Sequence, residues 1–336
     1  MFESIINFFR RFLAMFGDAR GGSKSLTFPQ KQLQVSISTV VLGEGGFSTV
    51  YQARERRTGT EFALKKVLVQ SEELQRSVRI ELKALQQFTH PHILTLVDWF
   101  ETRNERNVQV FYLLFPLMKK GTLRDELNMS MQTDPNRNQR DIGLVLKNFQ
   151  KICSALNYMH TYSPKYIHQD IKPENVLITD NGEPMLTDFG SVREAEVTID
   201  TRAKALAVAE EAAQFCTMPY RAIELFDPPT GSRLDSRTDV WGMGCLLWAW
   251  WYGYSPYECE FTSTGAVRVV ECSLTRVLSK IPHHPKPSDN DQFIADFAEY
   301  MLVSNPQLRP FCVDVIGRLS RTTVTGNKAT TDMTPV

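Results

Sequence analysis

The chain has 336 residues, of which 42% are hydrophobic and 23% charged, a composition typical of a soluble globular protein. Its 38 Lys and Arg residues equal its 38 Asp and Glu residues, so the formal net charge is zero. This balance argues against a general nucleic-acid-binding protein, which usually carries a basic excess. No apolar run reaches the roughly 18 residues that a membrane-spanning helix needs.

The six cysteines stand far apart and include no C-x-x-C pair. Such spacing indicates neither a zinc site nor a disulfide framework. Reduced thiols in a cytoplasmic protein are the simplest interpretation. The start of the chain carries no small-residue cleavage site, so we expect no secretory signal peptide.

Residues 2–16 place their apolar side chains, five phenylalanines among them, on one half of a helical wheel. Arg10 and Arg11 lie on the other half, and Gly17 and Asp18 follow as a helix stop. We therefore expect residues 1–17 to form an amphipathic helix that lies on a membrane surface, with the arginines against anionic headgroups. Docking of this helix on the rest of the chain or on a partner protein is the alternative.

Residues 18–32 are rich in glycine and serine and predict a linker. Five β-rich segments follow, with a helix expected near 72–88 between the third and fourth of them, and helices dominate from about residue 123. The five segments are residues 35–43, 47–55, 60–69, 93–100 and 108–116. The order predicts an α+β fold with a β-rich lobe over about 33–115, an α-rich lobe over about 116–322, and a cleft between them. Residues 323–336 are polar and predict a flexible tail.

Gly43, Gly45 and Gly46 lie between the first two predicted strands. Glycines let a backbone bend tightly and approach phosphate groups. No Gly-Lys-Ser/Thr follows, which excludes a Walker loop, and the next element is a strand, which excludes a Rossmann loop. Taken alone, the segment fits a plain hairpin turn about as well.

Lys65 lies within an apolar predicted strand, where its charge is costly unless it is paired. A functional interpretation pairs it with nucleotide phosphates and with Glu81 on the following helix. Glu81 is the best acidic candidate because it lies on the same side of that helix as the apolar residues. The alternatives are a lysine that extends to solvent, and a helix-start position for Glu72 and Glu73.

The segment from Tyr166 to Val176 carries the strongest signal, because it matches the H-x-D-x-x-x-x-N loop of phosphotransfer enzymes. Asp170 is the expected base that orients a substrate hydroxyl, and Asn175 supplies an amide oxygen for Mg²⁺. Lys172 is expected to neutralise the transferring phosphate. Asp188 follows thirteen residues after Asn175, in Asp-Phe-Gly, and is expected to chelate Mg²⁺. An isolated Asp is usually a turn former, but two such segments in this order make that interpretation improbable.

With these residues in place, residues 33–322 resemble a eukaryotic protein kinase. The finer resemblance is to the Numb-associated kinases, and within them to the myristoylated and palmitoylated serine/threonine kinase branch. The segments that carry it are GEGGFSTVY, HPHILTLVDWF, LLFPLMKKGTLRDEL, AKALAVAEEAAQFCTMPYRAIELF and RTDVWGMGCLLWAWWYGYSPYE. The resemblance implies transfer of the ATP γ-phosphate to serine or threonine hydroxyls of proteins, with ATP and Mg²⁺ in the cleft.

The resemblance also implies further roles. Phe115 would stand at the back of the adenine pocket, and Met118 would bond adenine through its backbone. Glu224 would pair with Arg309, and Asp239 would brace the catalytic loop. Together with these two adenine contacts, the implied ATP-binding residues are Leu42, Gly43, Glu44, Gly45, Gly46, Val50, Ala63 and Lys65.

The sequence departs from the kinase pattern at Gln169, which replaces the arginine that usually receives an activation-loop phosphate. Residues 201–214 are rich in alanine and predict a helix instead. We expect this helix to hold the activation segment and to make activity largely constitutive. A pseudokinase scaffold tethered by its N-terminal helix is the competing hypothesis, but Lys65, Glu81 and the other catalytic positions are all retained.

The relatives of that branch are lipidated through a glycine after the initiator methionine and through nearby cysteines. Here that position is Phe2, and no cysteine precedes Cys153, so we expect no N-myristoylation. The amphipathic helix is expected to substitute for the lipid. The resemblance implies peripheral attachment to Golgi or other trafficking membranes.

Overall fold

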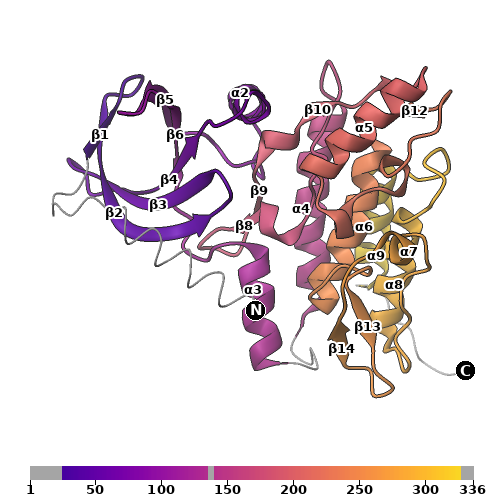
Figure 1. Cartoon of the computed structure of the whole chain (residues 1–336). Helices are drawn as coiled ribbons and strands as arrows, with labels where there is room; N and C mark the ends of the chain where they lie inside the picture. The colour runs from indigo at the N-terminus through magenta and orange to yellow at the C-terminus, as the bar shows by residue number, and fades with distance from the viewer. Residues whose placement is uncertain (1–24, 135–139, 327–336) are drawn as a thin grey trace, which may run out of the picture.

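A computed structural model of the protein describes residues 25–134 and 140–326. These residues form two lobes, with a sheet on one side of Figure 1 and a group of helices on the other. The predicted α+β bilobal fold is therefore confirmed. The amphipathic helix predicted over residues 1–17 lies outside the described residues.

The first lobe is a six-stranded antiparallel sheet with the strand order β1-β2-β3-β4-β6-β5. The strands are β1 (Ser25–Phe28), β2 (Leu33–Glu44), β3 (Ser48–Glu55), β4 (Glu61–Leu68), β5 (Asp98–Arg103) and β6 (Gln109–Pro116). The linker prediction was wrong for β1, which pairs with β2 from Ser25 opposite Ser36 to Phe28 opposite Leu33. Phe28 is fully buried there, so this short segment does contribute to the core.

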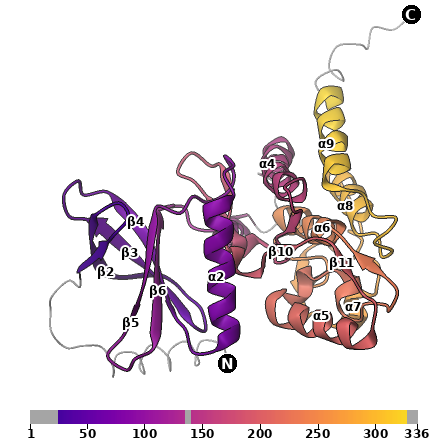
Figure 2. The same cartoon turned by 90° about the horizontal axis from the view of Figure 1, so that it is seen from above.

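Alternation along the strands gives the sheet two apolar faces. Leu64 and Leu114 face a small core within the sheet lobe, together with Phe28 and Val35. Their neighbours in β4 and β6 point to the opposite face, which joins the main core. Helix α2 (Glu72–Gln87) packs on that opposite face and stands between the sheet and the helical lobe in Figure 2. Ser71 caps α2 by accepting a hydrogen bond from the Leu74 N–H.

The second lobe is built around α6 (Arg237–Tyr252), in which every residue is buried. The helices around it are α3 (Leu123–Thr133), α4 (Ile142–His160), α5 (Arg202–Phe215), α7 (Leu274–Val277), α8 (Asp289–Met301) and α9 (Cys312–Gly326). Two-residue and three-residue strands connect them: β7 (Tyr166–Ile167), β8 (Val176–Ile178), β9 (Pro184–Leu186), β10 (Arg193–Glu194), β11 (Val197–Thr198), β12 (Arg233–Leu234), β13 (Cys259–Phe261) and β14 (Val267–Val269). Four single-turn 3₁₀ helices lie among these described elements, at Pro173–Asn175, Phe189–Ser191, Met218–Tyr220 and Ile223–Leu225.

Two further boundaries differ from the sequence prediction. The strand predicted over 93–100 forms only at its end, because Ile93 turns away to bridge Leu186 of the helical lobe. Helix α9 continues to Gly326, into the predicted tail. Of the helices within the described ranges, none combines the length and apolarity that a membrane crossing requires. All six cysteines are free thiols, and five of them are buried.

Candidate active site

The predicted ion pair between Lys65 and Glu81 is present and links the sheet to α2. Lys65 Nζ lies 2.7 and 2.8 Å from the two Glu81 carboxylate oxygens. Lys65 extends from the same face of β4 as Ala63, and Glu81 is 4% exposed on the buried side of α2. Glu72 and Glu73 occupy the first turn of that helix, the position that the alternative interpretation gave them.

Asp188 completes this charge cluster, with its Oδ1 3.5 Å from Lys65 Nζ. Burial alone would lower the pKa of Lys65, but the carboxylates of Glu81 and Asp188 outweigh it and raise that pKa. The positive charge of Lys65 in turn lowers the pKa of Asp188. Lys65 and Asp188 are therefore charged at neutral pH, and Asp188 keeps a half-exposed carboxylate. Burial raises the pKa of Glu81, and the positive charge of Lys65 opposes that rise.

Asp188 adopts a left-handed backbone with φ = +62°, which an aspartate accepts more readily than most residues. The next residue, Phe189, is fully buried against Phe88, just beyond the end of α2, and against the ring of His168. Ser77 of α2 donates a hydrogen bond of 3.0 Å to the Gly190 carbonyl. Added at Gly190, a Cβ atom would lie 2.9 Å from that hydroxyl, which explains the glycine at this close approach.

Asp170 and Asn175 lie together at the start of the β8–β9 hairpin. Asn175 Nδ2 donates to the Asp170 carbonyl at 2.7 Å and to Asp170 Oδ2 at 3.0 Å. The Thr187 N–H donates to the Asn175 carbonyl, so the segment that carries Asp188 is fixed beside this loop. Lys172 Nζ lies 2.8 Å from Asp170 Oδ2.

Asp239, at the start of α6, hydrogen-bonds to the backbone of the catalytic loop, as predicted. It accepts hydrogen bonds of 2.8 Å from the backbone N–H groups of His168 and Gln169 and from the His160 ring. Burial would raise the pKa of Asp239, but its hydrogen bonds to the His160 ring and to the His168 backbone N–H lower that pKa. The carboxylate therefore stays ionised and holds the backbone of the residues that precede Asp170.

The activation segment reaches the same carboxylate from the other side. The Thr217 N–H donates to Asp170 Oδ1 at 2.9 Å, and Lys172 Nζ donates to Thr217 Oγ1 at 2.6 Å. Further along, the predicted pair of Glu224 and Arg309 is present with two bonds of 2.8 Å. Both side chains are almost completely buried, and the Arg309 guanidinium lies over the Trp241 ring.

Helix α5 confirms the helix predicted over residues 201–214. Thr201 caps it by accepting from the Lys204 N–H, and three small apolar side chains on one face are buried. Two contacts that sequence reasoning missed fasten it to the catalytic core. Ser191 Oγ donates to the Phe215 carbonyl at 3.0 Å, and Arg193 lies 3.1 Å from Glu211. Neither contact has a sequence signal, because each joins residues that only this packing of α5 brings together.

The residues predicted to bind ATP gather along one face of the sheet and its connection to the helical lobe. Strand register sets Gly43 opposite Val50, Val50 opposite Lys65, and Ala63 opposite Phe115. Phe115 is buried, and Met118 packs against the main core just after β6. The Gly45 N–H donates to the Ser48 carbonyl, which closes the tight turn between β2 and β3. Leu42, Gly43, Glu44 and Gly46 are exposed in this arrangement.

The chemistry of these side chains fits a nucleotide with Mg²⁺. The Asn175 amide N–H groups are used by Asp170, which leaves the amide oxygen as the atom available to a cation. Asp188 adds a carboxylate oxygen. Within the described ranges there is no group of three or more His, Cys, Asp or Glu side chains that could hold a metal. Mg²⁺ does not need one, since it usually combines one or two carboxylates with water and substrate phosphates.

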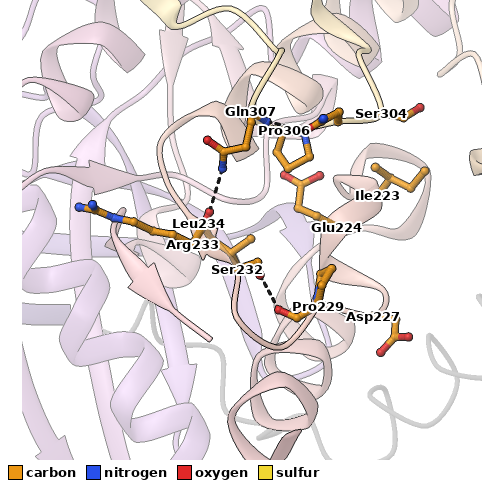
Figure 3. Close-up of a pocket in the computed structure, with 11 residues that line it drawn as sticks. Ile223, Glu224, Asp227, Pro229, Ser232, Arg233, Leu234, Ser304, Pro306 and Gln307 are labelled. Atoms are coloured by element: carbon orange, nitrogen blue, oxygen red, sulfur yellow. Dashed lines mark hydrogen bonds between the residues drawn. The ribbon is translucent and has the colours of Figure 1, made fainter. Parts of the chain in front are cut away.

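A separate cavity of about 350 Å³ lies in the helical lobe, beside Glu224 (Figure 3). Its walls come from the segment after α5 and from residues 304–307, and its lining includes Ile223, Pro229 and Pro306. None of the predicted catalytic or ATP-binding residues lines it. The candidate active site is therefore the charge cluster of Lys65, Glu81 and Asp188 together with the catalytic loop that carries Asp170 and Asn175.

A two-lobed fold with this arrangement of lysine, glutamate, catalytic loop and Asp-Phe-Gly segment defines a protein kinase. The model of the protein kinase domain family matches residues 37–318, so the chain belongs to this family. Family membership implies ATP as the phosphate donor and, typically, Mg²⁺ as its metal.

Similarity to individual relatives extends over most of the chain. Serine/threonine-protein kinase 16 of Rattus norvegicus is 34% identical over 279 residues, which cover 83% of this chain and 87% of that protein. The protein of the same name from Homo sapiens is 33% identical over 269 residues, or 80% and 84% of the two chains. A probable serine/threonine-protein kinase of Dictyostelium discoideum is 30% identical over 339 residues, or 81% and 90%.

Proposed function

We propose that this chain is an active serine/threonine kinase that transfers the ATP γ-phosphate to protein hydroxyls. One observation carries the proposal: Lys65 contacts both Glu81 and Asp188 while Thr217 and Lys172 both contact Asp170. The groups that phosphotransfer requires are thus already assembled. A pseudokinase scaffold would have no need to keep these five separate segments in this arrangement.

In this proposal Asp170 orients the substrate hydroxyl and accepts its proton, and Lys172 stabilises charge on the transferring phosphate. Lys65 binds the nucleotide phosphates, with Glu81 fixing its position. Asn175 and Asp188 hold Mg²⁺, which neutralises phosphate charge when bound. Leu42, Val50, Ala63, Phe115 and the Met118 backbone form the adenine pocket, and the Gly43–Gly46 turn covers the phosphates.

Serine and threonine specificity is supported by Thr217 and Lys172. Their hydrogen bond of 2.6 Å fixes the substrate-facing part of the activation segment against the catalytic loop. The names of the relatives from rat, human and Dictyostelium agree with this specificity. The finer affiliation that we propose is the Numb-associated kinase family and its myristoylated and palmitoylated branch.

We further propose that activity does not depend on activation-loop phosphorylation. Gln169 has no charge with which to receive a phosphate, and α5 already holds the activation segment through its own contacts.

The proposal includes a cytoplasmic location with attachment to trafficking membranes through residues 1–17. The five phenylalanines and two arginines of that segment support it. Loss of residues 1–17 without any change in liposome flotation would remove the membrane part.

The catalytic proposal is tested by incubating the full chain with Mg²⁺ and γ-labelled ATP, alone and with myelin basic protein as a general acceptor. Phosphoserine or phosphothreonine is expected with the wild-type chain and is expected to disappear in both Asp170→Asn and Lys65→Met. Nucleotide binding without any transfer by the wild-type chain would instead establish the scaffold.

A further inference from the structure

The catalytic loop carries a glutamine, Gln169, at the position before Asp170, and the amide nitrogen of this side chain is buried without a hydrogen bond in the described structure. Gln169 is 7% exposed and has a left-handed backbone with φ = +72°. An amide here cannot attract an anion from the activation segment as a guanidinium would. Any electrostatic connection between that segment and the catalytic loop must come from another residue.

Arg193 is placed to make that connection. It lies in β10, directly opposite Ile167 of β7, and Ile167 is followed by His168, Gln169 and Asp170. A two-residue antiparallel ladder therefore joins Arg193 to the strand that leads into the catalytic loop. Its side chain is 14% exposed, so its guanidinium is largely withdrawn from water.

The anion that meets this guanidinium is a carboxylate of α5. Glu211 Oε2 lies 3.1 Å from Arg193 Nη1, and the Arg193 Nε atom is buried without a hydrogen bond in the described structure. Glu211 lies one helical turn before Phe215, whose carbonyl accepts the hydrogen bond from Ser191. The end of α5 is thus held at two points of the segment that follows Asp188.

From this end of α5 the chain runs directly to the substrate side of the site. Cys216 follows Phe215 and is buried, and burial raises the pKa of its thiol to about 12, so it carries no charge there. Arg221 donates to the Cys216 carbonyl at 2.9 Å. The next residue is Thr217, whose N–H donates to Asp170. Glu211 thus precedes Thr217 by only six residues, so the position of Glu211 influences the backbone group that bonds to Asp170.

We infer that Glu211 is a positioning residue, a carboxylate encoded in the sequence that does for this activation segment what an added phosphate does in a phosphorylation-dependent kinase. It pairs with Arg193 and not with the residue before the catalytic aspartate. The inference rests on the proposed kinase activity and specifies how its independence from phosphorylation arises.

The change that tests this inference is Glu211→Gln, which keeps the shape of the side chain and removes its charge. The change leaves the mostly buried Arg193 guanidinium without its anion, so a charge-assisted hydrogen bond is lost. We expect kcat toward myelin basic protein to fall on the order of tenfold, which corresponds to the loss of one such interaction in the transition state. KM for ATP is expected to stay within about twofold, because Lys65 and Asp188 are untouched.

Two variants serve as controls. Glu210→Gln removes the same charge from the neighbouring position of α5, which is exposed like Glu211, and is expected to match the wild-type chain because the pair with Arg193 is kept. Glu211→Asp keeps the charge and is expected to recover most of kcat, a rescue that a merely structural effect of α5 would not show. All chains are treated with phosphatase first, and their melting temperatures are compared.

An unchanged kcat in Glu211→Gln, or an equal loss in Glu210→Gln, would overturn the inference while leaving the proposed function intact. A loss in Glu211→Gln that Glu211→Asp fails to recover would also overturn it, because the effect would then not depend on charge. If the phosphatase-treated wild-type chain is itself inactive, the proposed phosphorylation-independent activity fails, and this inference fails with it.

Discussion

Asp170 and Thr217 are 47 residues apart in the sequence and are joined by a hydrogen bond of 2.9 Å from the Thr217 N–H to Asp170 Oδ1. The other carboxylate oxygen of Asp170 lies 2.8 Å from Lys172 and 3.0 Å from the Asn175 amide. Each oxygen of this carboxylate is therefore fixed by a different part of the helical lobe. A carboxylate held in this way loses little entropy when a substrate hydroxyl arrives.

Replacing Thr217 by alanine removes the hydroxyl that accepts from Lys172 and keeps the backbone N–H that bonds to Asp170. We expect kcat/KM for a protein acceptor to fall about tenfold, since a short hydrogen bond to a charged group is lost next to the reacting atoms. Steady-state kinetics measure the effect. Thr217→Ser restores the hydroxyl and should return most of the activity, and equal losses in both variants would contradict this role.

The pair of Glu224 and Arg309 is expected to be important for stability. The exposed fraction of the side chain is 3% for Glu224 and 0% for Arg309. Replacing Glu224 with Gln leaves a buried guanidinium without its carboxylate, a change that costs about 3–5 kcal/mol of the free energy of unfolding. Urea denaturation measures this free energy.

The exposed pair of Arg202 and Asp227, with a similar separation of 2.6 Å, is the matched control for that experiment. Asp227→Asn should unfold at the same urea concentration as the wild-type chain, because exposed ion pairs contribute little. A Glu224→Gln/Arg309→Gln double variant should lose less than the sum of its two single variants. Additive losses would mean that the two buried side chains act independently.

Stability at high pH should decline in part through Cys216. Burial raises the pKa of its thiol from 9.0 to about 12. Between these two values the unfolded chain loses a proton that the folded chain keeps, so the free energy of unfolding falls as the pH rises. The thiol contributes up to about 1.4 kcal/mol per pH unit to this decline.

Urea midpoints measured from pH 8.5 to 10.5 test this contribution. Cys216→Ala lacks the thiol and should lose stability less steeply with pH than the wild-type chain. An identical slope in the two chains would show that Cys216 does not cause the alkaline loss.

Local sequence signals predicted the bilobal fold and two of its ion pairs, Lys65 with Glu81 and Glu224 with Arg309. The loop from Tyr166 to Val176 and the Asp-Phe-Gly segment have fixed spacing, and Glu81 could be selected by its position on one helix face. What the sequence could not predict depends on long-range packing. The sequence of Ser25–Phe28 resembles a linker, and only the burial of Phe28 against the sheet makes it a strand. Ile93 is not part of its expected strand because it forms a β-bridge with Leu186 of the other lobe. Arg193 and Glu211 are ordinary surface charges in the sequence, and only the course of α5 pairs them.

The most direct test of the central claim is phosphotransfer by the chain after complete removal of phosphate. The protein is treated with phosphatase, checked by intact mass, and mixed with Mg²⁺, γ-labelled ATP and myelin basic protein over a time short enough to precede autophosphorylation. The account predicts immediate labelling of serine or threonine without a lag, and no labelling by Asp170→Asn. Labelling that starts only after the chain has phosphorylated itself, or equal labelling by Asp170→Asn, would contradict it.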